Sequence, residues 1–232
     1  MPALIRVGHR GAPVFAPDNT IASFDAALAI GVDMIEFDIL PARGRSPELY
    51  VAHDQRALDP SRSLTLSAAL QHFATPAYAG IRLQLDIKRR GIEERVLAAL
   101  DASGTRTRAF ISTGLRGVLP RFRELAPEIP RGWTVPDIPG IGAAPGLGRL
   151  YAARIPARAG SRIRAGEINA LVPHFSLVDA ALVEAVSAAG GEIYVWTVNA
   201  AAELARLAAL GVTGVITNDP RLFSAIVQTD AL

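Results

Sequence analysis

Residues 4–39 read LIRVGHRGAPVFAPDNTIASFDAALAIGVDMIEFDI, and this stretch holds the signals of two strands with a helix between them. The apolar segments 4–8 and 34–39 each predict a short strand. An Asn-Thr pair at residues 19–20 can cap a helix, and Gly31 can end it in a left-handed conformation. Two strands connected through a helix of this length predict a parallel β-α-β unit.

The same alternation continues along the rest of the chain. Further strands are predicted at residues 81–87, 108–112, 132–135, 168–172, 192–198 and 214–217, and a short extended piece at 49–52. Further helices are predicted at residues 66–73, 92–100, 115–125, 150–159, 178–189, 201–210 and 220–227, with a Gly- and Pro-rich loop at 136–148. Eight strand-then-helix units predict a closed (β/α)8 barrel, the TIM barrel of the α/β class. No G-x-G-x-x-G follows the first strand, which disfavours a dinucleotide-binding sheet.

Composition narrows the class of protein further. The eight units account for the whole chain, so residues 1–232 are expected to form a single domain. The chain has no cysteine, which excludes disulfides and thiolate metal sites. No apolar segment predicts a signal peptide or a membrane span, so no stable membrane insertion and a cytoplasmic location are expected. A formal net charge of +2, with scattered charges, gives no indication of nucleic-acid binding.

Two carboxylates in the predicted strand 34–39 are separated by a single residue. Residues i and i+2 of a strand point to the same face, so Glu36 and Asp38 are expected side by side. In a sheet interior they would repel each other and lose hydration, and a hard divalent cation would compensate both effects. The alternative is an amphipathic edge strand whose acids face water.

Other polar residues also stand at or just beyond the ends of predicted strands. They are His9, Arg10, Glu36, Asp38, Asp86, Lys88, Ser112, His174, Trp196, Asn199 and Asn218. In a (β/α)8 barrel the C-terminal ends of the strands carry the active site, so we expect these side chains to meet there.

Seven motifs carry a resemblance to a known family. They are HRG (9–11), PDNT (17–20), EFD (36–38), HD (53–54), DIK (86–88), VWTVN (195–199) and GVITNDP (214–220). Together they resemble the glycerophosphodiester phosphodiesterase family, from the first predicted strand to the last. The resemblance implies a metal-dependent barrel that cleaves a small-molecule phosphodiester into an alcohol and a phosphomonoester.

The resemblance also implies a role for individual residues. Glu36, Asp38 and Asp86 would bind a divalent cation, Mg²⁺ or Ca²⁺. His9 and His53 would exchange protons with the substrate. Arg10 and Lys88 would hold the phosphate, whose developing negative charge requires positive partners. Lys88 is the only lysine of the chain, in a sequence that otherwise uses arginine.

The chemistry of the two histidines is left open at this point. One imidazole can be neutral and the other protonated near neutral pH, as removal and delivery of a proton require. The residue types do not say which one is the acid. They also leave open whether the substrate's own neighbouring hydroxyl attacks the phosphorus, which would give a cyclic phosphate.

The sequence departs from the family pattern in three places. Aspartate stands at Asp18 and Asp86 where the family usually has glutamate, which shortens the reach of each carboxylate. The hairpin after Asp38 reads PARGRSPEL in place of a T-x-D-G motif. The connection between residues 54 and 66 is short, so the insertion domain of larger members is expected to be minimal or absent.

Two further residues have both a functional and a structural interpretation. His174 could contribute to substrate binding or pack in a loop. Trp196 could form the wall of a pocket for a glycerol or apolar moiety, or fill the barrel core. His72 lies within a predicted helix and is interpreted as a surface histidine, and the arginines between residues 154 and 164 as a solvated helix face.

Three functions are therefore to be distinguished. The first is hydrolysis of a glycerophosphodiester to an alcohol and glycerol phosphate, by a monomer or a homodimer. The second is a phospholipase D-type action on a lysophospholipid or sphingomyelin. The third, of another class, is an inactive barrel that binds a phosphorylated ligand.

Overall fold

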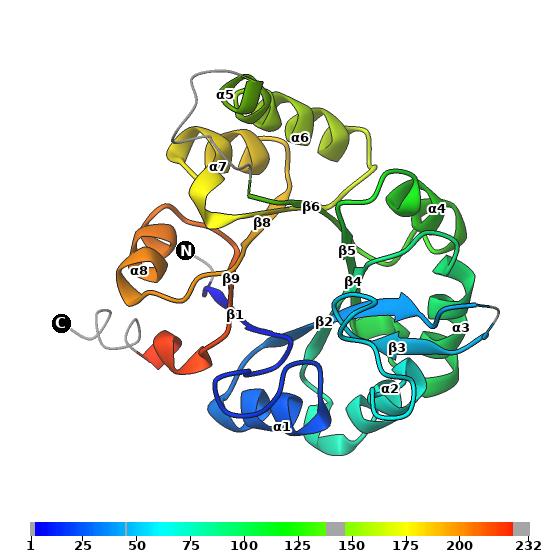
Figure 1. The fold of residues 1–232 in the computed structure, drawn as a ribbon. Helices are drawn as coiled ribbons and strands as arrows, with labels where there is room; N and C mark the ends of the chain where they lie inside the picture. Colours follow the sequence, from blue (N-terminus) through cyan, green and yellow to red (C-terminus); the bar gives the residue numbers. More distant parts are fainter. Residues whose placement is uncertain (1–2, 45, 138–146, 225–232) are drawn as a thin grey trace.

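The computed structural model describes residues 3–44, 46–137 and 147–224. Eight parallel strands close into a barrel, and helices surround it on the outside (Figure 1). The ring closes at β1 (Ile5–His9), which pairs with β2 (Met34–Pro41) on one side and β9 (Gly214–Thr217) on the other. The predicted (β/α)8 TIM barrel is therefore confirmed.

The remaining elements follow the order that the sequence predicts. The other barrel strands are β4 (Arg82–Ile87), β5 (Ala109–Thr113), β6 (Arg131–Val135), β7 (Ala170–Pro173) and β8 (Glu192–Val195). The helices are α1 (Ile21–Ile30), α2 (Leu66–Phe73), α3 (Glu93–Ser103), α4 (Val118–Leu125), α5 (Leu147–Ala152), α6 (Ile155–Arg164), α7 (Ala180–Ser187) and α8 (Ala201–Ala209). Single 3₁₀ turns lie at η1 (Pro76–Tyr78), η2 (Arg106–Arg108), η3 (Phe175–Leu177) and η4 (Pro220–Phe223). None of the helices in these described ranges is long and apolar enough to cross a membrane.

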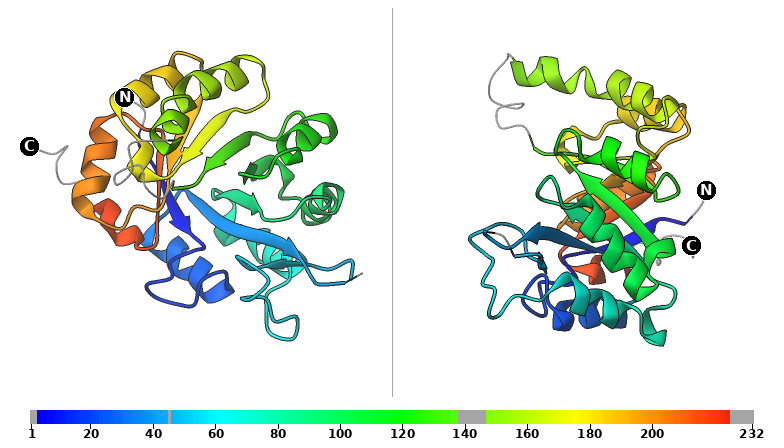
Figure 2. Two further views of the ribbon diagram at one scale, coloured as in Figure 1. Left: turned by 45° about the horizontal axis from the view of Figure 1, so that its top comes forward. Right: turned by 90° about the vertical axis from the view of Figure 1, so that its right-hand side faces the viewer.

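One short strand lies outside the barrel ring. β3 (Leu49–Val51) pairs antiparallel with the last residues of β2 and forms a hairpin. Figure 2 shows that this hairpin extends from the end of the barrel opposite to the start of β1. The segment 52–65, which connects β3 to α2, therefore begins at the mouth of the barrel and carries His53 there.

The first helix shows why the sequence signals were informative. The Thr20 side chain accepts a hydrogen bond from the Ser23 amide and caps α1. Gly31 follows the helix with φ 93° and ψ 47°, a left-handed conformation that glycine adopts without steric cost. Thr20 is thus the cap, and Asn19 is free for another role.

The chain differs from the sequence prediction around its fifth and last helices. The predicted helix 150–159 is in fact two helices, α5 and α6. Pro156 lies in the first turn of α6, where its missing N–H is tolerated, but a proline in the interior of one continuous helix would break it. Residues 220–223 form a 3₁₀ turn, and residues 225–227 of the predicted helix 220–227 lie outside the described residues, as do residues 138–146 of the predicted loop.

Buried apolar side chains form two groups. One fills the space between the strands and the surrounding helices and includes a contact of Phe24, Phe37 and Phe73, with ring centroids 4.9–5.8 Å apart. The second fills the inside of the barrel, with Val7, Met34, Phe110, Ala170, Val172, Tyr194 and Ile216. This inner group lies directly below the polar residues at the mouth of the barrel, and two of its members, Val172 and Ile216, line the cavity there.

A glycine in β6 makes room for this inner core. A Cβ atom added at Gly132 would lie 2.6 Å from Phe110 Cζ and 2.8 Å from Val172 Cγ2. We therefore expect Gly132→Ala to lower the free energy of unfolding by about 1–3 kcal/mol, the usual cost of overpacking, in a urea titration. The matched control is Gly80→Ala, where a Cβ would meet nothing within 4 Å. This control should be neutral or stabilise by up to about 1 kcal/mol, and equal effects in both variants would contradict the packing argument.

Candidate active site

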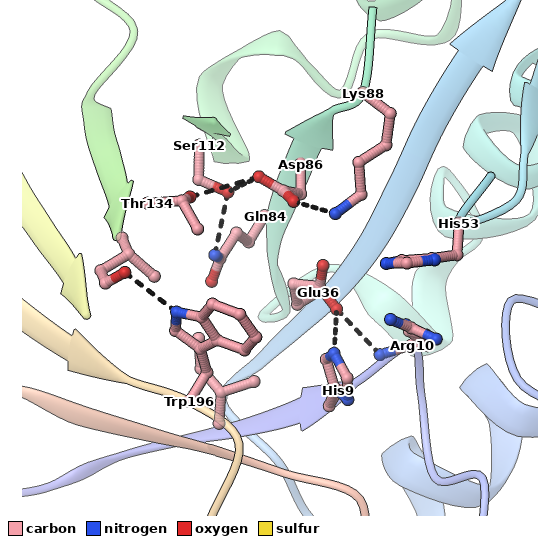
Figure 3. A pocket seen from close by; sticks show the side chains of 12 residues that line it. His9, Arg10, Glu36, His53, Gln84, Asp86, Lys88, Ser112, Thr134 and Trp196 are labelled. Carbon is pink, nitrogen blue, oxygen red and sulfur yellow. Dashed lines mark hydrogen bonds and ion pairs between the residues drawn. The ribbon is translucent and has the colours of Figure 1, made fainter. Parts of the chain in front are cut away.

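A small cavity opens at the C-terminal end of the barrel. Figure 3 shows polar side chains from several different strands pointing into it. Seven of the nine site residues that the sequence predicts line this cavity: His9, Arg10, Glu36, His53, Asp86, Lys88 and Trp196. The other two are Asp38, which is buried beside it, and His174, which stands behind Trp196.

Three carboxylates converge at the cavity. β2 and β4 pair so that Asp38 is opposite Asp86, while Glu36 precedes Asp38 by one strand repeat on the same face. Each of the three offers one oxygen, and these oxygens lie within 4.8 Å of one another. Glu36, Asp38 and Asp86 are only 4%, 1% and 8% exposed. The alternative of an edge strand with its acids in water is therefore wrong.

Two cations lie against these carboxylates. Lys88 Nζ is 2.9 Å from Asp38 Oδ1 and also contacts Asp86. Arg10 Nε is 3.0 Å from Asp38 Oδ2, and Arg10 Nη1 donates to Asp18 at 2.9 Å. Burial alone would raise the pKa of Asp38, but Lys88 and Arg10 outweigh it and lower that pKa below its ordinary value. Asp38 is thus the carboxylate whose charge the protein itself compensates.

Glu36 has no comparable compensation. Its carboxylate accepts a hydrogen bond from the Arg10 backbone N–H at 3.0 Å, and His9 Nε2 lies 3.8 Å away. Burial first, and then the charges of Asp38 and Asp86, raise the pKa of Glu36 well above 4.5. An additional positive charge at this point would reverse that effect. The donor set is made only of carboxylate oxygens, which hard divalent cations prefer, so these residues fit such an ion.

Asn19 is a site residue that the sequence analysis interpreted only as a possible helix cap. Its side-chain Nδ2 donates to Asp38 Oδ2 at 3.0 Å, and its Oδ1 accepts from the Asp38 backbone N–H at 3.3 Å. Both Asn19 and Arg10 have positive φ, 58° and 54°, which is uncommon outside glycine. The loop between β1 and α1 is therefore held in an unusual conformation that turns both side chains toward Asp38.

His9 is the more buried of the two cavity histidines. Its Nδ1 lies 2.6 Å from Asn218 Oδ1, an acceptor at the end of β9. Burial, and next the charge of Arg10, lower the pKa of His9 to about 4. His9 is consequently neutral at neutral pH, with the proton on Nδ1 and a free lone pair on Nε2. The Asn218 side chain was noted at a strand end but was not assigned to the site.

His53 has a different environment. It follows β3 in the connecting segment, its side chain is 46% exposed, and its Nδ1 is 3.5 Å from Asp54 Oδ2. It lines the same cavity as His9 but comes from the segment after β3, whereas His9 is the last residue of β1. The two imidazoles therefore line one cavity in different environments. The His9 side chain is largely buried, and the His53 side chain is about half exposed to solvent.

Asp86 is held by hydroxyl groups from the next two strands. Ser112 Oγ donates to Asp86 Oδ1 at 3.0 Å, and Thr134 Oγ1 approaches the same oxygen at 3.3 Å. Gln84 Nε2 in turn donates to Ser112 Oγ at 3.1 Å. The sequence analysis placed Ser112 at a strand end but did not single out Gln84 or Thr134. Their only signal was inward register, of Gln84 on β4 with Asp86 and of Thr134 on β6, two strands further along.

Trp196 lines the cavity on the side opposite His53 (Figure 3), and the His174 ring packs against it. Trp196 Nε1 donates to the Val172 carbonyl oxygen at 3.0 Å, which leaves the ring to line the cavity. The His174 ring meets the Trp196 ring edge-on, with centroids 5.6 Å apart, and its Nδ1 lies 2.8 Å from Ser176 Oγ. His174 can support the tryptophan from this position, and its role in substrate binding stays a prediction.

A polar cavity with perturbed ionisable groups, at the C-terminal end of a (β/α)8 barrel, defines a barrel enzyme. Comparison with known families agrees with this class and identifies the family. The family model described as the glycerophosphoryl diester phosphodiesterase family matches residues 9–63 and 52–222. The chain belongs to this family and is a phosphoric diester hydrolase.

Individual relatives match over nearly the full length of the chain. YhdW of Bacillus subtilis is 28% identical over 244 residues, which cover 92% of this chain and 94% of that protein. The glycerophosphodiester phosphodiesterase of Caldanaerobacter subterraneus is 23% identical and covers 96% and 97%. An Oleispira antarctica phosphodiesterase, solved in complex with the product sn-glycerol-3-phosphate, superposes with a TM-score of 0.74 at 21% identity, covering 97% of each chain.

Proposed function

We propose that this protein hydrolyses a glycerophosphodiester to an alcohol and glycerol phosphate in the cavity at the barrel mouth. The observation that carries the proposal is the meeting of three buried carboxylates and two imidazoles in one cavity. The family membership and the glycerol phosphate product of the Oleispira relative support the same substrate class.

Glu36, Asp38 and Asp86 are proposed to hold a divalent cation, Mg²⁺ or Ca²⁺. When bound, such a cation neutralises charge on the phosphate oxygens and polarises the phosphorus toward attack. The geometric support is the set of oxygens within 4.8 Å, and the electrostatic support is the unfavourable charge of Glu36 in its absence. Arg10 and Lys88, which already lie at this cluster, supply further positive charge to the phosphate.

His9 is proposed as the general base and His53 as the general acid. Because His9 Nδ1–H donates to Asn218 Oδ1, the lone pair of Nε2 is available to take a proton from the attacking hydroxyl or water. His53, which is half exposed and paired with Asp54, can take up a proton from solvent and give it to the departing alkoxide. Trp196 forms a wall against which the carbon chain of the substrate packs.

A second candidate substrate is a lysophospholipid. Val14 and Phe15, in the loop between β1 and α1, are 53% and 49% exposed. Apolar side chains exposed next to an active-site mouth are suited to contact an acyl chain. This observation supports the phospholipase D-type alternative more than it supports an inactive phosphate-binding barrel.

A metal-supplemented substrate screen tests the proposal. We expect release of the alcohol from water-soluble glycerophosphodiesters with Mg²⁺ or Ca²⁺, at a kcat/KM at least about tenfold above that for lysophospholipids or sphingomyelin. A preference of the opposite sign would favour the lipid substrate. Binding of glycerol phosphate without turnover of any diester would favour the inactive barrel.

A further inference from the structure

Gln84 has an unmatched polar atom inside the barrel. Its side chain is 2% exposed and points inward from β4, one strand repeat below Asp86. Three buried side-chain atoms of the described residues make no hydrogen bond, namely Arg10 Nε, Asp38 Oδ1 and Gln84 Oε1. Arg10 Nε and Asp38 Oδ1 each lie within 3.0 Å of an oppositely charged atom. Gln84 Oε1 is uncharged and has no hydrogen-bond donor among the described residues. A buried acceptor of this kind is rare in proteins and unfavourable unless a partner is supplied.

The orientation of the Gln84 amide follows from the hydrogen bond that its neighbour Ser112 donates to Asp86. The Ser112 hydroxyl donates its one proton to Asp86 Oδ1 at 3.0 Å. Ser112 Oγ is then an acceptor toward Gln84 and receives Nε2–H at 3.1 Å. The nitrogen of the amide is fixed on the Ser112 side, and the oxygen is directed away from it.

The Gln84 oxygen is directed into the substrate cavity. Gln84 lines that cavity, and Figure 3 shows the end of its amide in the space between Thr134 and Trp196. The surrounding walls include the Trp196 ring, Val172 and Ile216, which are apolar. A charged ammonium group would lose hydration against these walls, whereas a hydroxyl on a short carbon chain would find an acceptor and apolar contacts.

We propose that Gln84 Oε1 accepts a hydrogen bond from a hydroxyl of the glycerol phosphate moiety and so determines the preference for a hydroxylated substrate. The inference rests on the proposed function, because the phosphate must be held at the carboxylate cluster for its carbon chain to reach Gln84. The residue acts here as a direct ligand, in addition to its support of Ser112.

The test compares two ligands with two forms of the metal-supplemented protein by titration calorimetry. The ligands are glycerol 3-phosphate and propyl phosphate, which has the same charge and carbon chain but no hydroxyl. We expect the wild-type protein to bind glycerol 3-phosphate roughly tenfold more tightly, the scale of one satisfied buried hydrogen bond. Gln84→Met keeps the length of the side chain and removes its acceptor, so this ratio should fall to about one.

A purely structural role of Gln84 predicts a different result. If Gln84 only orients Ser112 and Asp86, Gln84→Met weakens both ligands in equal proportion and the ratio stays at its wild-type value, which overturns the proposal. Thr134→Val is the matched control: it removes a hydrogen bond to Asp86 in the same cavity, whereas Gln84→Met removes the one to Ser112, and it is expected to keep the ratio.

The wild-type measurement alone also decides the inference. A ratio near one in the wild-type protein overturns it, whether or not Gln84→Met folds. Hydrolysis of glycerophosphodiesters, measured separately, shows whether the proposed function stands. Turnover without hydroxyl discrimination would reject only the role of Gln84, and discrimination without turnover would reject only the hydrolase reaction.

Discussion

His9→Ala is expected to lower kcat by about 100-fold or more, and His53→Ala by a similar factor, because each removes one of the two proton-transfer groups. The measurement is kcat with saturating metal and the best diester of the substrate screen. The thermal unfolding midpoint of each variant should show that the barrel is intact. Near-normal turnover in either variant would reject the role of that histidine.

The two histidines can be separated by the leaving group. With a p-nitrophenyl ester, whose leaving group needs no proton, the loss in His53→Ala should shrink to less than about tenfold. The loss in His9→Ala should persist, since the attacking oxygen must still be deprotonated. The reverse pattern would exchange the acid and the base.

His72→Ala is the matched control for both histidine variants. His72 lies in α2 on the outside of the barrel, where its Nε2 is 2.7 Å from Asp25 Oδ1. This variant loses an imidazole of the same size but should keep kcat within about twofold, as expected for a residue that contacts no reacting group.

Removal of divalent cations is expected to abolish hydrolysis, and addition of Mg²⁺ or Ca²⁺ to restore it. Glu36→Gln should reproduce the loss of activity even with saturating metal, because one of three carboxylate ligands is replaced by a neutral amide. Activity that persists after thorough chelation would exclude the proposed role of the three acids.

Although Glu36→Gln is expected to lose activity, it should make the metal-free protein more stable. Glu36→Gln removes a buried, poorly compensated carboxylate and is expected to stabilise metal-free protein by on the order of 1–3 kcal/mol. In a barrel of this size that corresponds to an increase of the unfolding midpoint of roughly 2–4 °C per kcal/mol. The stabilisation that added metal gives to the wild-type protein should be lost in the variant.

The pH dependence of this effect has a defined sign. The folded pKa of Glu36 is raised above its ordinary value of 4.5, so the folded state binds the proton more tightly than the unfolded chain. Metal-free wild-type protein should therefore lose stability as pH rises from about 4.5 through the folded pKa, and Glu36→Gln should not. A variant that follows the wild-type curve in this range would contradict the assignment.

Asp38→Asn is the matched control for Glu36→Gln. The pKa of Asp38 is lowered by Lys88 and Arg10, so its charge is stabilising, and the amide would remove the buried carboxylate that these two partly buried cations share. We expect this variant to destabilise the metal-free protein, opposite in sign to Glu36→Gln, although both variants lose activity.

Local sequence was sufficient to predict most of the fold. Neighbouring residues alone set the periodicity of each strand and helix, and also the Thr20 cap and the Gly31 helix end. Eight strand-then-helix units form a parallel sheet, and both faces of such a sheet are buried when it closes into a barrel that the helices cover. The division of residues 150–159 was missed because the effect of Pro156 depends on which turn of a helix it occupies.

The candidate site was predicted in part for the same reason. His9 and Asp86 lie at or next to the ends of β1 and β4, and Glu36 and Asp38 lie in β2, which pairs with both of these strands and so brings the four residues together. Asn19 was interpreted as a helix cap because its contact with Asp38 spans 19 residues of the chain.

The sequence by itself determined the order of strands and helices and most of the polar residues that line the cavity at the barrel mouth. Only the tertiary structure decided the chemical state of those residues. The His9 proton position depends on Asn218, 209 residues away, and the orientation of the Gln84 amide depends on Ser112. Likewise, Glu36 and Asp38 are two residues apart but have pKa values shifted in opposite directions. The reason is that protonation and hydrogen-bond direction are set by distances and burial among residues from different strands, which the order of residues along one chain does not contain.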